Sequence, residues 1–129
     1  MELAEVIDYW RRLSDEKWKT VEALMEKECY ADALFFVHLS LEALLKAVVV
    51  EKTGIAAPPI HNLPKLALLA HLETDGTQTE QLRDINTFNV RARYDDYKSS
   101  LYRAATKEYT AAYFDIAKKL RLWIQNQQS

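Results

Sequence analysis

The chain has 129 residues, the size of one domain, and 49% of them are hydrophobic, enough for one compact core. With only 2 glycines and 3 prolines, a turn-rich sandwich or barrel, a collagen-like chain and a flexible linker are excluded. The 28% of charged residues and net charge of −2 also exclude a disordered tail and a histone-like basic binder. Composition therefore predicts a single α-helical domain over residues 1–129.

Apolar residues first recur at helical spacing over residues 3–27, for example Leu3, Val6 and Trp10. The polar stretch at residues 14–16 could cap a second helix and break this one. The acidic start of the chain lacks the basic and apolar segments of a secretion signal. We therefore expect a cytoplasmic protein.

The second predicted helix spans residues 30–52 and ends before Gly54, a residue suited to the left-handed position after a helix. Its apolar residues cover nearly the whole circumference, which predicts burial on several sides, inside the bundle and against a second subunit. Polar residues interrupt it, and charge inside a bilayer is costly, so we expect no membrane span. Cys29 precedes this helix. As the single cysteine it fits a reducing compartment, and we expect it to be a small buried side chain.

All three prolines lie in residues 54–64, which predicts one long loop. A short helix should follow from about residue 63, with Pro64 in its first turn, to about residue 72. After a turn at residues 74–76, the spacing of Thr77 and Glu80 predicts a capping box that opens the next helix. That helix should carry four residues on one side: Leu82, Ile85, Phe88 and Asn89.

The remaining chain has no glycine or proline after Gly76. Only the polar residues 93–100 indicate a bend before a last helix at about 101–126. The sequence thus predicts an up-and-down antiparallel bundle of four to five helices.

Charge is unevenly distributed along the chain. Residues 1–82 hold 8 basic and 14 acidic side chains, net −6, whereas the later residues hold 9 and 5, net +4. The basic half also contains five tyrosines, so it could offer phosphate contacts beside stacking rings to single-stranded nucleic acid. Alternatively, it is a solvated helix face whose tyrosines pack into the core.

His38, Glu42 and Lys46 are spaced four apart in the apolar second helix and therefore share one stripe. Burying such charges without partners costs several kcal/mol. Two interpretations are open. Glu42 and Lys46 form an ion pair on a partly exposed edge while His38 bonds a backbone carbonyl, or the stripe is the floor of a cleft.

The second cluster lies at residues 89–97, where Arg91 and Arg93 precede two aspartates. The arginines could grip a phosphate, or the aspartates could neutralise them. Asp95 and Asp96 point in different directions on a helix, so we expect no metal site. We expect no cofactor either, since no glycine-rich phosphate loop is present.

Three segments together resemble the HEPN domain, the helical domain shared by nucleotide-binding proteins of higher eukaryotes and prokaryotes. They are FFVHLSLEALLKAVV at 35–49, PPIHNLPKL at 58–66 and NVRARYDDY at 89–97. The resemblance covers about residues 5–125. It implies a bundle similar to the helical domain of kanamycin-type nucleotidyltransferases, and usually a homodimer.

The family resemblance also implies two rival activities. Some HEPN proteins are metal-independent endoribonucleases that use an arginine and a histidine separated by four to six intervening residues. Others are binding modules encoded beside a minimal nucleotidyltransferase, as toxin and antitoxin partners. In this chain no histidine stands at that distance from Arg91 or Arg93, and Asp95 replaces the proline of a frequent Arg-Tyr-Pro.

We therefore expect a nucleotide- or RNA-binding module rather than an enzyme. It should act as a homodimer and as the partner of a nucleotidyltransferase-like protein. An endoribonuclease that borrows His38 or His61, and a purely structural assembly subunit, are the alternatives. The candidate ligand-binding residues share the arginine cluster and the polar stripe: Arg91, Arg93, Tyr94, Asp96, Glu42, Lys46, His38 and His61.

Overall fold

The computed structural model describes residues 2–127, apart from the side chains of residues 95–98. These residues form six α-helices and no strand: α1 (Leu3–Glu26), α2 (Tyr30–Thr53), α3 (Leu63–Leu69), α4 (Gly76–Arg93), α5 (Asp95–Ala104) and α6 (Lys107–Asn126). The predicted all-α bundle is confirmed.

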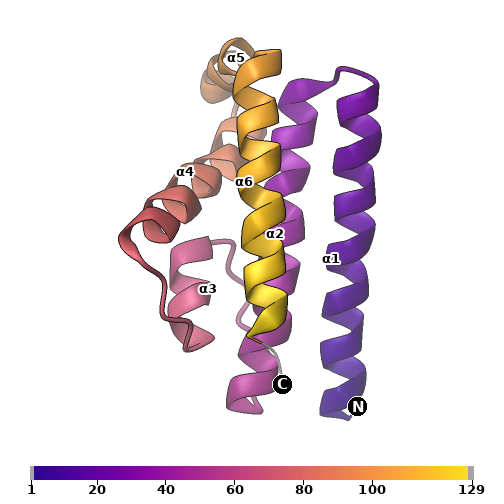
Figure 1. Cartoon of the computed structure of the whole chain (residues 1–129), viewed down its shortest axis with the longest axis vertical. Helices are drawn as coiled ribbons and strands as arrows, with labels where there is room; N and C mark the ends of the chain where they lie inside the picture. The colour runs from indigo at the N-terminus through magenta and orange to yellow at the C-terminus, as the bar shows by residue number, and fades with distance from the viewer. Residues whose placement is uncertain (1, 128–129) are drawn as a thin grey trace.

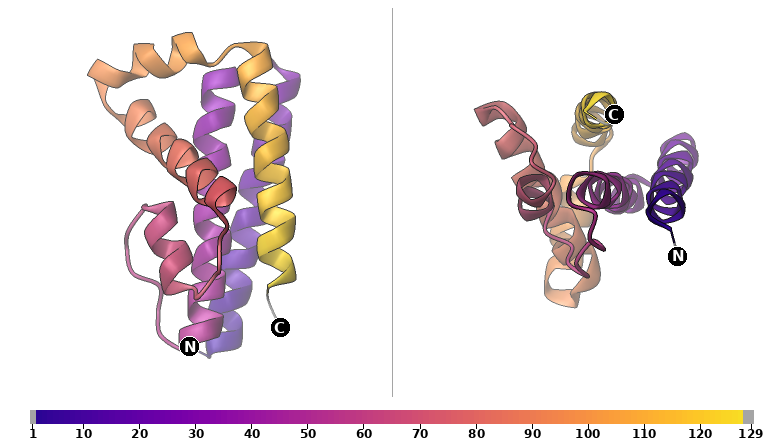
Figure 2. Two further views of the ribbon diagram at one scale, coloured as in Figure 1. Left: turned by 60° about the vertical axis from the view of Figure 1, so that its left-hand side comes forward. Right: turned by 90° about the horizontal axis from the view of Figure 1, so that it is seen from below.

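The long helices alternate in direction along the longest axis of the molecule (Figure 1). α1 runs up, α2 down, α4 obliquely up and α6 down, which is the expected up-and-down order. α2 lies in the centre, with α1 on one side and α4 and α6 on the others (Figure 2). α5 crosses one end of the bundle and connects α4 to α6.

The central position of α2 follows from its sequence. Its residues from Ser40 to Val50 are all buried, and the core forms around them. α2 is long and apolar enough to cross a membrane by length and composition, but 83% of that window is buried inside the protein, as in a core helix. The buried positions of α4 are the four predicted on one side: Leu82, Ile85, Phe88 and Asn89.

The predicted last helix is wrong in one respect, because it is divided into α5 and α6. α5 ends at Ala104, and the Thr106 side chain then accepts a hydrogen bond from the Tyr109 amide as the N-cap of α6. A threonine is a favoured N-cap residue, because its hydroxyl oxygen accepts a hydrogen bond from an amide of the first helical turn that has no partner within the helix. The predicted bend within residues 93–100 is found at Tyr94, whose backbone is extended between α4 and α5.

α1 is not broken at Ser14, because the polar side chain is used between helices. Ser14 Oγ donates to the carbonyl oxygen of Ser40 at 2.7 Å, and Ser40 Oγ donates to the carbonyl of Ser14 at 2.9 Å. Arg121 from α6 reaches the same place and binds Asp15 at 2.9 Å. This buried polar junction ties α1, α2 and α6 together.

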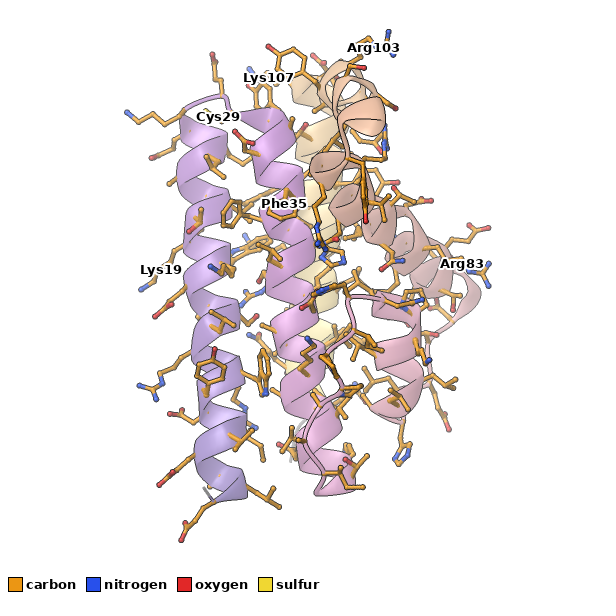
Figure 3. All side chains as sticks on the ribbon, turned by 180° about the vertical axis from the view of Figure 1, so that it is seen from behind. Lys19, Cys29, Phe35, Arg83, Arg103 and Lys107 are labelled. Atoms are coloured by element: carbon orange, nitrogen blue, oxygen red, sulfur yellow. The ribbon has the colours of Figure 1, made fainter. Side chains whose placement is uncertain are left out.

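Cys29 is exposed, contrary to the expectation that it is buried. It lies in the turn between α1 and α2, where Glu28 adopts a positive φ of 60° and the chain reverses at the end of the bundle (Figure 3). A position in a surface turn overrides the general tendency of cysteine to be buried.

The capping box that opens α4 also differs from the prediction. Asp75 is the N-cap: its carboxylate accepts from the Gln78 amide at 2.7 Å, while the Gln78 side chain accepts from the Asp75 amide at 3.0 Å. The box therefore lies two residues before Thr77 and Glu80. Aspartate is a better cap than threonine, and its charge also suits the positive end of the helix.

We predict that Asp75→Ala lowers the free energy of unfolding by about 1 kcal/mol, because the amides of the first turn lose their acceptor. Urea unfolding followed by circular dichroism measures this. Thr77→Ala is the matched control, since Thr77 is exposed in the same first turn, and it should change stability by less than about 0.5 kcal/mol. An equal loss in both variants would contradict this assignment of the cap.

Candidate functional site

The stripe of His38, Glu42 and Lys46 is almost completely buried in the middle of α2. It therefore does not lie on a partly exposed edge. The chain supplies the partners that such burial requires: the loop before α3 and the last turns of α4 cover the stripe, and Trp10 of α1 covers its other end.

His38 uses both ring nitrogens. Its Nε2 donates to the carbonyl oxygen of His61 at 2.9 Å, and its Nδ1 accepts from the Asn89 side-chain amide at 3.5 Å. This pattern requires a neutral ring. Burial lowers the pKa of His38, while the Glu42 carboxylate and the hydrogen bond to His61 act in the opposite direction. His38 therefore holds the loop in place and has no nitrogen left for a substrate.

Glu42 is the centre of the cluster because two side chains share its carboxylate. Lys46 Nζ donates to Oε2 at 3.1 Å, and His61 Nδ1 donates to Oε1 at 2.9 Å. The Lys46 ammonium also lies 5.1 Å from the centre of the Trp10 ring, in a cation–π contact. The predicted pairing of Glu42 with Lys46, and of His38 with a backbone carbonyl, is therefore found in the structure.

His61 connects this buried cluster to solvent. Its side chain is 52% exposed, although its Nδ1 is fixed by a carboxylate that is only 11% exposed. The loop is anchored just beyond it, where the Leu63 amide donates to the Asn86 side chain of α4 at 2.9 Å. With Nδ1–H bound to Glu42, Nε2 carries a lone pair and is able to accept a proton.

The two arginines point to different places because they lie two residues apart on one helix. Arg93 is one turn after Asn89 and donates to its side-chain oxygen at 3.4 Å. Arg91 faces α5 instead and donates to the carbonyl oxygen and the hydroxyl of Ser100 at 3.2 and 3.1 Å. Arg93 thus joins the cluster around His38, whereas Arg91 holds α5 against α4.

Two further candidates remain, Tyr94 and Asp96. Tyr94 is exposed at the junction of α4 and α5. The side chain of Asp96 lies outside the described residues. Among the residues that the structure describes, no three His, Cys, Asp or Glu side chains are grouped to hold a metal ion.

Asn89 and Trp10 are the members of the site that residue chemistry alone did not single out. Asn89 links Arg93 to His38, and Trp10 covers Lys46. The sequence does contain a signal for Asn89, because it is the one polar residue on the buried side of α4. The polar contacts form one continuous chain that we call the α2 network: Trp10, Lys46, Glu42, His61, His38, Asn89 and Arg93.

The lowered pKa of His38 predicts a pH dependence of stability. Because the unfolded chain binds this proton more tightly than the folded one, the contribution of His38 is complete above about pH 6.5 and is lost as the pH falls below it. The loss is at most about 1.4 kcal/mol per pH unit.

Urea unfolding between about pH 7.5 and about pH 5.5 measures this slope. His38→Gln should flatten it, and the exposed His71→Gln should leave it as in the wild type. An unchanged slope in His38→Gln would contradict the assignment. Should that variant not fold, the His38 ring signals of the wild type, followed by NMR, should titrate below pH 6.5, the ordinary pKa of a histidine.

Comparison with known proteins agrees with this architecture. The crystal structure of TT1696 from Thermus thermophilus matches the fold with a TM-score of 0.77, covering 93% of this chain and 96% of that chain, at 18% sequence identity. At this identity the likeness concerns the fold alone. A search of curated proteins finds no match. The family model of the HEPN domain matches residues 7–127, nearly the whole chain, and the chain therefore belongs to the HEPN domain family.

Proposed function

We propose that this protein is a nucleotide- or RNA-binding helical module in which Arg93 contacts the phosphate. Membership of the HEPN family suggests such a module. The single observation that carries the proposal is the position of Arg93 at the solvent end of the α2 network. It hydrogen-bonds the neutral Asn89, and no carboxylate of the described residues lies within ion-pair distance of it.

The other cation of the α2 network is not available to a phosphate. Lys46 is buried and its charge is neutralised by Glu42 at 3.1 Å. A guanidinium at the surface, in contrast, offers several donors in a plane that fits two phosphate oxygens. The exposed ring of Tyr94, the next residue in the chain, offers a face on which a base could stack.

We also propose that the protein acts as a homodimer and as the partner of a nucleotidyltransferase-like protein, in a pair of the toxin–antitoxin kind, within the reducing cytoplasm. Most residues of α2 are buried within its own bundle, so we expect neighbouring helices to supply most of the dimer contact. Native mass spectrometry of the untagged protein isolated from its host reports subunits, retained nucleotide and partner in one spectrum. A monomer without a partner chain would contradict this part of the proposal.

Replacement of Arg93 by alanine should weaken the binding of a fluorescein-labelled single-stranded oligoribonucleotide by about tenfold or more, because a charge-assisted hydrogen bond is lost. Fluorescence anisotropy at constant salt measures it. Arg83→Ala is the matched control, an exposed arginine about 15 Å earlier on the same helix (Figure 3).

The control should bind RNA as the wild type does, and both variants should keep the thermal stability of the parent. Equal affinity of Arg93→Ala and the wild type would refute the role of Arg93. A drop in melting temperature without a change in affinity would instead assign Arg93 to the fold.

A second candidate function, metal-independent cleavage of RNA, is favoured by the contact of Glu42 with His61. A carboxylate that fixes Nδ1–H of a histidine leaves Nε2 in the orientation of a general base. In RNA cleavage this base would remove the proton of a 2′-hydroxyl while the arginine stabilises the charged phosphate. His38 does not fit this role because both of its nitrogens are used inside the protein.

This candidate predicts cleavage of single-stranded RNA in the presence of a chelator. His61→Ala should reduce the rate about a hundredfold, the usual contribution of a general base. The control variant His71→Ala, at an exposed position, should cleave RNA at the rate of the wild type. Absence of cleavage above a buffer control removes this candidate and leaves the binding module.

A further inference from the structure

The first half of α1 has an apolar stripe that the bundle buries only in part. The buried residues of α1 are Ser14, Trp18 and Val21, all in its second half. Before them the apolar residues remain partly or largely accessible, including Leu3 and Trp10. α1 is the outermost long helix, and it packs along α2 with its other side open (Figure 2).

Two adjoining hollows follow this open side. The larger has a volume of about 560 Å³ and lies between the first turns of α1 and the loop after α2, with Val6, Tyr9 and Ala57 in its wall. The smaller, of about 260 Å³, continues along α1 to Glu16. They share Tyr9 and Arg12, so together they form one groove, which we call the α1 groove.

The dimensions of the α1 groove suit another helix. From Glu5 to Glu16 it follows about 16 Å of α1, or about three turns. A helix that docks in a groove needs this length, because its apolar anchors recur at every third or fourth residue over two to three turns. Tyr9 is 53% exposed in the middle of the groove and offers a large apolar contact.

The charges at the rim select the partner. Three acidic residues line the groove: Glu5, Asp8 and Glu16. The one basic residue in its lining is Arg12, which is already paired with Asp8 at 3.0 Å. All six acidic residues of α1 are exposed, compared with two of its basic residues. Two copies docked through this face would bring acidic rims together, which is unfavourable, whereas a basic helix would be attracted.

We propose that the α1 groove is a docking site for a cationic amphipathic helix of another protein. Its apolar side would cover Val6, Tyr9 and Trp10, and its lysines or arginines would meet the acidic rim. The inference is independent of phosphate binding at Arg93, since the groove contains no residue of that end of the α2 network.

The probe for this site is a fluorescein-labelled synthetic amphipathic helix of about 18 residues of leucine and lysine, with a leucine and glutamate peptide of the same pattern as comparison. Anisotropy titration should show binding of the lysine peptide at least about tenfold tighter than of the glutamate peptide. Binding should weaken as salt increases.

Tyr9→Glu should abolish binding of the lysine peptide, because it places a charge in the apolar centre of the groove. The matched control is Leu68→Glu, at another apolar surface position that is 74% exposed on α3. It should bind as the wild type does. The double variant Glu5→Lys, Glu16→Lys keeps the apolar wall and should reverse the preference between the two peptides.

Several results would overturn the proposal. They are failure of the lysine peptide to bind, equal affinity for both peptides, and equal loss of binding in Tyr9→Glu and Leu68→Glu. Sedimentation equilibrium tests whether a second copy of this chain occupies the groove instead. A wild-type dimer that dissociates in Tyr9→Glu would show that a second copy covers the groove, and would overturn the proposal. Circular dichroism melts confirm that the variants are folded.

Discussion

The buried carboxylate of Glu42 is the constraint on which the rest of the site depends. Its two oxygens are shared between Lys46 of the same helix and His61 of the loop before α3. Loss of Lys46 would leave Glu42 as an uncompensated buried charge, which costs about 3–5 kcal/mol, and loss of His61 would leave a buried carboxylate oxygen without its hydrogen-bond donor. The loop before α3 is therefore held in one position against α2. This also fixes His61, the only histidine of the α2 network that reaches solvent.

The same carboxylate connects the interior of the bundle to its surface chemistry. His38 bonds the backbone of His61 and the side chain of Asn89, and Asn89 in turn holds Arg93. A neutral histidine in the core thus aligns a half-exposed histidine from a loop and an arginine from the end of α4. The arrangement separates structural groups, which are buried and fully bonded, from groups that can meet a ligand.

A second polar junction in the core has a different consequence. Ser14, Ser40 and Arg121 join α1, α2 and α6, and the Arg121 guanidinium lies 5.0 Å from the Trp18 ring. This junction lies in the second half of α1, where the helix is buried. The first half has no such tie to α6 among the described residues, which is why its apolar stripe forms a groove rather than a core.

Periodicity and composition determined the helical class, the central burial of α2 and the buried side of α4, because these depend on where apolar residues recur along one helix. Spacing also placed His38, Glu42 and Lys46 on one stripe. Local pattern failed in three places. Asp75 rather than Thr77 caps α4, because aspartate is the better cap. Ser14 bonds across helices instead of ending one, and Cys29 is exposed in a turn. The meeting of Glu42 with His61, and the choice of Arg93 rather than Arg91 as the arginine that joins the cluster, were decided only by the fold, since they depend on the path of a loop and the rotation of α4 against α2.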